Sequence, residues 1–150
     1  MRRLPVSLLT GALVFAALVA TAGPAVANAP RDAIDQLNQI RRAHGLAELR
    51  PSISLHRSST RYAHQMMSHG YFGHSSRIAV GSQFGQAGET LALHSGWSAQ
   101  PRQTISQWMN SPGHRAVLLS SRFRWVGMGL ARGNSGSGPV TVWVAHVGAR

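Results

Sequence analysis

The sequence has 150 residues, of which 15 are basic and 4 acidic, so its formal net charge is +11. It contains no cysteine, which excludes a disulfide framework, a zinc site of the cysteine type and thiol catalysis. This length predicts one domain, and a hydrophobic fraction of 43% argues against disorder in spite of the charge.

The amino terminus has the three-part layout of a secretory signal peptide. A basic start at residues 1–3 is followed by an apolar run at 8–20 and by small residues up to Ala27. The apolar run is shorter than the roughly 18 residues of a membrane-spanning helix. We therefore predict a signal peptide at 1–27, a secreted protein and one domain at 28–150; an uncleaved anchor is the alternative. Without Arg2 and Arg3, 13 basic and 4 acidic residues leave a charge of about +9.

Four helices are predicted in chain order. Apolar positions at helical spacing indicate a helix over 30–44 and a second over 52–69, each followed by a glycine. Residues 71–88 are rich in glycine and serine and are predicted to form a loop. A third helix is expected over 101–109. Ser111 then suits the cap and Pro112 the first position of a fourth helix.

The last 26 residues change from helical to strand periodicity. Residues 125–131 and 140–147 are rich in β-branched and aromatic side chains, and a glycine- and serine-rich segment separates them. This pattern predicts two antiparallel strands. A further strand is expected near 89–93. Helices first and a hairpin last predict an α+β domain, in which helices cover an antiparallel sheet.

Three residues on separate elements are candidates for chemistry. Glu89 is the only acidic residue after Pro51, and it borders an apolar segment. His74 lies in a loop after a helix, and His114 is near a helix amino terminus, whose dipole favours a neutral ring. Two histidines and a glutamate are the ligand types of an open zinc site. The alternative is a structural carboxylate that pairs with an arginine or caps a turn.

Other catalytic classes lack their motifs. The chain has no His-Glu-x-x-His helix, no Gly-x-Ser-x-Gly elbow and no lysine for a phosphate-binding loop. The arginines are scattered and no aromatic platform stands out, so we expect no nucleic-acid partner.

Several motifs occur in the order known from one family. They are Phe72-Gly73-His74-Ser75, Gly88-Glu89-Thr90-Leu91-Ala92, Trp108-Met109-Asn110-Ser111-Pro112-Gly113-His114-Arg115 and Val126-Gly127-Met128-Gly129. The chain resembles a bacterial, cysteine-free member of the CAP superfamily (cysteine-rich secretory proteins, antigen 5 and pathogenesis-related proteins), also called the SCP domain. The resemblance implies an α-β-α sandwich and a central cleft with a divalent-metal site.

Carried over by position, the resemblance implies that His74, Glu89 and His114 hold the metal. Ser111 stands where the family has a second glutamate, so we place it in the cleft but not among the ligands. His146 occupies a position that is often acidic, and Thr90 and Val117 stand where asparagine is common. With fewer carboxylates, the resemblance implies weak binding of a divalent metal such as zinc.

Three functions compete at this point. We expect a secreted, monomeric, non-catalytic protein whose cleft binds an unknown small or extended ligand. The first alternative is a metal-assisted hydrolase of peptide or cell-wall material, with Glu89 as general base. The second is a cationic module that adheres to anionic cell-wall polymer or lipid, because all 15 basic residues are arginine.

Overall fold

A computed structural model of the chain describes residues 28–150, so the expected signal peptide at 1–27 lies outside the described residues. The helices are α2 (Ala29–Ala43), α3 (Ile53–His69), α4 (Pro101–Met109) and α5 (Pro112–Leu118). The strands are β1 (Arg50–Pro51), β2 (Gln86–Ser95), β3 (Trp125–Ser135) and β4 (Gly138–Ala149). All four predicted helices are found.

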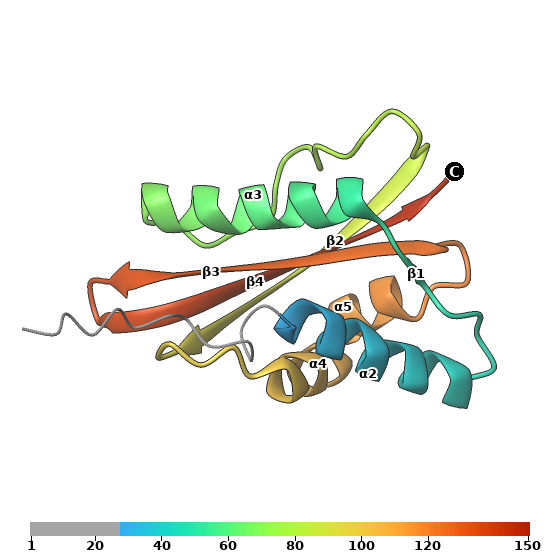
Figure 1. The fold of residues 1–150 in the computed structure, drawn as a ribbon, viewed down its shortest axis with the longest axis horizontal. Helices are drawn as coiled ribbons and strands as arrows, with labels where there is room; N and C mark the ends of the chain where they lie inside the picture. Colours follow the sequence, from blue (N-terminus) through green and yellow to red (C-terminus); the bar gives the residue numbers. More distant parts are fainter. Residues whose placement is uncertain (1–27) are drawn as a thin grey trace, which may run out of the picture.

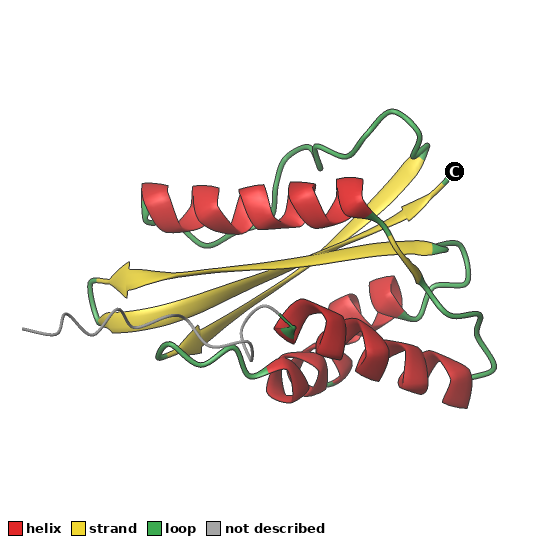
Figure 2. Ribbon diagram, in the orientation of Figure 1, coloured by secondary structure: helices red, strands yellow, loops and turns green. Residues whose placement is uncertain are grey.

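The elements form three layers around one sheet (Figure 1). The strand order is β1-β3-β4-β2; β4 pairs antiparallel with both β2 and β3, and the short β1 pairs parallel with β3. Helix α3 covers one face of the sheet, and α2, α4 and α5 cover the other (Figure 2). The predicted α-β-α sandwich of the α+β class is confirmed, with the two residues of β1 making the sheet mixed.

Successive side chains of β2 and β4 point to opposite faces of the sheet, as in any β-strand. Leu91 and Val144 pack with α3 in a small cluster, whereas Ala92 and Ala145 belong to the larger core under the other helices. Glu89 is two residues from Leu91 on β2, and His146 is two residues from Val144 on β4, so they point to the same face as Leu91 and Val144. Both side chains therefore lie on the face that α3 covers.

Two glycines of β3 allow α3 to lie directly on the sheet. A Cβ at Gly127 would stand 2.0 Å from the backbone nitrogen of His56, and one at Gly129 would stand 2.4 Å from that of Thr60. No side chain fits at either position, because real contacts do not approach 3 Å. Gly127 is also the cross-strand partner of His146, so this close approach brings α3 down onto the strand that carries His146.

The opposite layer is tied together by a buried arginine. The Arg41 side chain, on α2, is fully buried and donates to the carbonyl oxygens of Ala47 at 2.9 Å, Leu118 at 2.6 Å and Ser120 at 3.1 Å. Burial, with the positive charge of Arg124, lowers the pKa of Arg41. The guanidinium fastens the end of α2 to the segment that follows α5.

The strands are longer than the sequence pattern indicates. Strand β2 extends beyond the expected 89–93, and the hairpin strands extend through the glycine- and serine-rich segment to a turn at 136–137. Paired backbone hydrogen bonds continue there without apolar side chains. Helix α3 ends as predicted at Gly70, whose φ of 66° is left-handed. Within residues 28–150, no helix is long and apolar enough to cross a membrane.

Candidate functional site

Glu89 lies on β2, an outer strand of the sheet, with its side chain only 3% exposed. Its Oε1 accepts hydrogen bonds from Nδ1 of His74 at 2.9 Å and from the backbone nitrogen of Ser75 at 3.0 Å. Its Oε2 accepts one from Nε2 of His146 at 3.0 Å. The loop after α3 and strand β4 thus hold the carboxylate from two sides. The sequence left open a structural carboxylate paired with an arginine or capping a turn; the partners of Glu89 are two histidines and a backbone nitrogen.

The hydrogen bonds continue from His146 to α3. The Ser58 hydroxyl donates to the carbonyl oxygen of Ala79 at 2.8 Å, and its oxygen lies 2.8 Å from Nδ1 of His146. Because the Glu89 carboxylate only accepts, Nε2 of His146 is the donor in their hydrogen bond. The other ring nitrogen, Nδ1, shares a hydrogen bond with the Ser58 hydroxyl. The buried His146 ring is therefore held between Ser58 and Glu89.

The same hydrogen bonds affect the ionisation state of Glu89. Burial alone would raise the pKa of Glu89, but the hydrogen bonds from His146, Ser75 and His74, together with the positive charge of His146, lower it below its usual value. The carboxyl is therefore ionised at neutral pH. A carboxylate with a lowered pKa and both oxygens occupied is a poor general base.

His74 and His114 meet at the edge of the sheet. His74 hydrogen-bonds Glu89 on the α3 side with its side chain 60% exposed, while His114 belongs to α5 in the opposite layer. Their ring centroids are 6.0 Å apart. Burial, and then the charge of His74, lowers the pKa of His114, which favours a neutral ring. Nδ1 of His114 is buried and has no hydrogen-bond partner among the described residues.

The predicted site is thus assembled in part. His74 hydrogen-bonds Glu89 and lies near His114, whereas the side chain of Ser111, which precedes α5, makes no capping hydrogen bond. Residues 28–150 contain no group of three His, Asp or Glu side chains able to hold a metal ion. As folded, both carboxylate oxygens of Glu89 accept hydrogen bonds within the protein, so Glu89 is not free to serve as a ligand. Zinc binding stays a prediction of the sequence.

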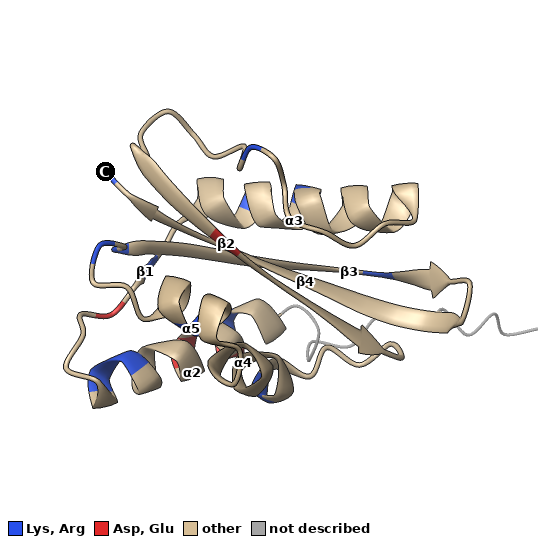
Figure 3. Cartoon of the chain, turned by 180° about the vertical axis from the view of Figure 1, so that it is seen from behind, with Lys and Arg blue, Asp and Glu red and all other residues tan. Residues whose placement is uncertain are grey.

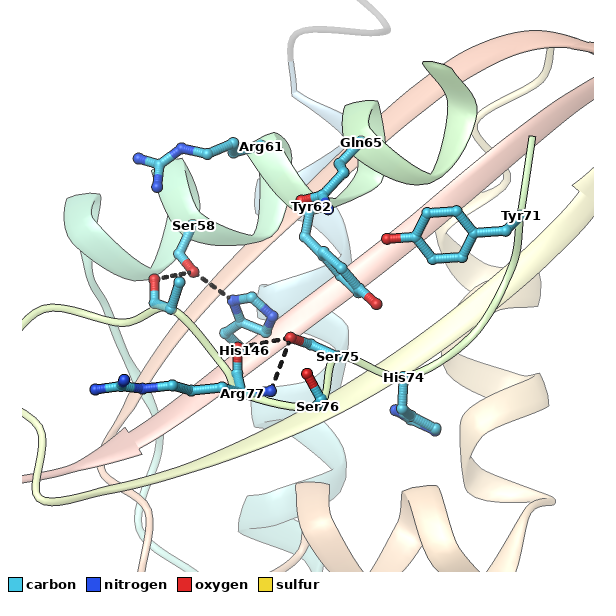
Figure 4. A pocket seen from close by; sticks show the side chains of 11 residues that line it. Ser58, Arg61, Tyr62, Gln65, Tyr71, His74, Ser75, Ser76, Arg77 and His146 are labelled. Atoms are coloured by element: carbon cyan, nitrogen blue, oxygen red, sulfur yellow. Dashed lines mark hydrogen bonds between the residues drawn. The ribbon is translucent and has the colours of Figure 1, made fainter. Parts of the chain in front are cut away.

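A cavity of about 410 Å³ opens beside this network, between α3 and the loop that follows it. His146 and Ser58 form part of its wall, together with Tyr62, Tyr71 and His74 (Figure 4). The Tyr62 hydroxyl donates to the carbonyl oxygen of Gly73 at 2.7 Å and so fastens the loop to α3. Burial, then the Tyr71 hydroxyl and the Glu89 charge, raises the pKa of Tyr62, which keeps its proton.

Three residues of the site are absent from the sequence prediction: His146 as a partner of Glu89, Ser58 and Tyr62. A signal for His146 was available, because it is the one titratable side chain in the apolar run 140–147. A polar group within a buried strand needs a partner. Ser58 offered no comparable signal, since a serine in a helix is ordinarily solvated.

Comparison with known proteins places the chain in a family. It is 32% identical over 108 residues to YlbC, an uncharacterized membrane protein of Bacillus subtilis, covering 66% of this chain and 30% of that protein. It is 27% identical over 111 residues to YkwD, an uncharacterized protein of the same bacterium, covering 68% and 42%. The chain therefore spans less than half the length of either relative.

Solved structures share the fold. An outer surface protein of Borrelia burgdorferi matches with a TM-score of 0.67 and 18% identity, over 82% of this chain and 93% of that one. An extracellular protein of Bacillus anthracis that contains an SCP domain matches with a TM-score of 0.67 and 23% identity, over 83% and 41%. The sequence profile of the cysteine-rich secretory protein family, CAP, matches residues 34–147. The chain belongs to this family.

Proposed function

We propose that the protein is secreted and binds a ligand in the cavity beside Tyr62 and His74, without catalysing a reaction. The observation that supports binding over catalysis is that the Glu89 carboxylate is already engaged in hydrogen bonds. Both of its oxygens accept hydrogen bonds within the protein, and its side chain is 3% exposed. No substrate proton can reach it without breaking that network.

Ser58 is a poor nucleophile for a related reason. The series Ser58, His146 and Glu89 has the order of a serine-hydrolase triad, but the Ser58 hydroxyl donates to the carbonyl oxygen of Ala79. A hydroxyl that directs its proton to a backbone carbonyl is not activated by the histidine. The network therefore serves to fix the cavity wall.

Secretion is supported by two observations. The sequence at 1–27 has the layout of a signal peptide. Two proteins with the same fold are described as an outer surface protein and as extracellular. Mass spectrometry of exported protein tests this, and an intact amino terminus would contradict it.

Ligand binding is tested by nuclear magnetic resonance with a library of neutral and charged small molecules. We expect shifts at the resonances of Tyr62, Tyr71 and His74. A Gln65→Trp substitution should abolish them by filling the cavity, since Gln65 lines it. Gln103→Trp, on an exposed position of α4, is the matched control. Shifts that survive Gln65→Trp would contradict the proposal.

A further inference from the structure

An open groove of about 1210 Å³ continues from the cavity along α3. The two hollows share Ser58, Arg61, Arg77 and Ala79, so they adjoin each other. The walls of the groove are α3 on one side and residues 77–87, the loop and the start of β2, on the other. An open groove of this volume along a helix fits an extended chain better than a compact molecule.

The groove carries three arginines and no carboxylate. Arg57 and Arg61 lie one turn apart on α3, and Arg77 lies on the loop; all three are exposed and line the groove. None of the three side chains forms a salt bridge or a hydrogen bond with another described residue. No Asp or Glu is among the lining residues of either hollow.

Figure 3 shows this arrangement: the basic segments of α3 lie near the basic segment of the loop, and the acidic segment of β2 lies below α3. That acid is Glu89, which hydrogen-bonds His146 and is not among the lining residues of either hollow. Two like charges one helical turn apart repel each other and weaken a helix. An anionic ligand would remove this repulsion.

We propose that the groove binds an anionic polysaccharide. Arginine forks bind carboxylate and sulfate or phosphate groups in pairs of hydrogen bonds. The other polar lining groups are neutral donors and acceptors of the kind that bind sugar hydroxyls; Ser82 is one, and Ser54 on α3 and Gln83 on the loop hydrogen-bond each other at 2.7 Å. A flat lipid surface cannot follow a groove between a helix and a loop. A single-stranded nucleic acid would need a row of stacking aromatic rings, and Phe84 is the one aromatic residue of the groove wall.

The test measures binding of polygalacturonate and heparin by titration calorimetry, with dextran as the uncharged polymer. Both anionic polymers should bind at low salt and weaken as salt rises, and dextran should not bind. Arg57→Gln/Arg61→Gln/Arg77→Gln should weaken binding about tenfold or more. Because these residues are exposed, the fold should remain intact, which circular dichroism checks.

The control variant removes the same charge elsewhere. Arg31→Gln/Arg102→Gln/Arg122→Gln changes three exposed arginines outside the groove and should alter affinity less than threefold. Equal losses in the two variants, or equal binding of dextran, would overturn the proposal. So would tighter binding of single-stranded DNA or anionic vesicles through the same arginines.

This inference rests partly on the proposed function, because the groove opens into the cavity. The two fail separately. If small molecules shift the cavity resonances in the native protein but not in Gln65→Trp, while the groove variant binds the polymers normally, only the polysaccharide proposal is lost. If Gln65→Trp leaves those shifts unchanged, the cavity proposal is lost.

Discussion

Replacing Glu89 by alanine should destabilise the protein far more than any other loss of an acidic side chain. The substitution leaves Nε2 of the buried His146 ring without its acceptor and removes the acceptor for the backbone nitrogen of Ser75. Leaving a buried polar group without its partner costs about 1–3 kcal/mol, and this substitution leaves two such groups. In a domain whose unfolding free energy is about 5–15 kcal/mol, that is a large share.

The matched control is Glu48→Ala, whose exposed partner is Arg42. An exposed pair contributes about 0–1 kcal/mol. Glu89→Gln should fall between the two, at about 1–2 kcal/mol. Its amide oxygen can still accept from His74 and Ser75, but its amide nitrogen cannot accept from Nε2 of His146, so the variant keeps part of the hydrogen bonding and loses the negative charge.

Urea unfolding followed by tryptophan fluorescence measures these differences, since Trp108 and Trp143 are fully buried. The free energy of unfolding measured at acid pH gives a second test. Because the folded pKa of Glu89 is lowered, its contribution is complete above the usual value of 4.5 and is lost as the pH falls through the folded value. The difference between the native protein and Glu89→Gln should therefore shrink below pH 4.5. A Glu89→Ala cost within about 1 kcal/mol of the Glu48→Ala cost would refute the stabilising role of the buried Glu89–His146 hydrogen bond.

Three further substitutions are tested by the same unfolding assay. Gly129→Ala should lower the free energy of unfolding by about 3 kcal/mol, because its Cβ would meet the backbone of α3 at 2.4 Å. The control Gly136→Ala has open space around its Cβ and should be nearly neutral. Equal urea midpoints for the two variants would contradict the close approach of α3. Arg41→Met should cost about 3 kcal/mol by leaving buried carbonyls without donors, and Arg42→Met, at the surface, less than about 1 kcal/mol; similar losses would argue against the buried clamp. Burial lowers the pKa of His94, so the folded state favours the neutral ring. The protein should therefore lose stability as the pH falls below about 6.5, by at most about 1.4 kcal/mol per pH unit. His94→Gln should reduce this dependence of stability on pH between about pH 7.5 and 5.5, and an unchanged dependence would contradict the role of His94.

Local patterns predicted most of the fold. Apolar spacing and the capping residues located all four helices, because those signals lie within a few residues of one another. The extension of β2 and of the hairpin could not be read in this way. There the backbone continues to pair with β4 although the side chains, such as those of Gln86 and Asn134, are polar. Pairing partners tens of residues away decide these boundaries.

The site shows the same division. His74, Glu89 and His114 were identified by residue type and setting, and the fold brings them together. The hydrogen-bond network around Glu89 could not be predicted, because Ser58 and His146 are 88 residues apart in the sequence. Their contact depends on how closely α3 lies on β3. That distance is set by the absence of side chains at Gly127 and Gly129, a packing property that no single-residue preference reports.

The Arg41 side chain acts in this cysteine-free domain much as a disulfide does in other small domains. Its guanidinium hydrogen-bonds the carbonyl oxygens of Leu118 and Ser120, which lie 77 and 79 residues further along the sequence. A cross-link made of hydrogen bonds needs no oxidant, so it can form in any redox compartment. Because the acceptors are backbone carbonyls, the link depends on the side chain of Arg41 and not on the side chains of Leu118 and Ser120.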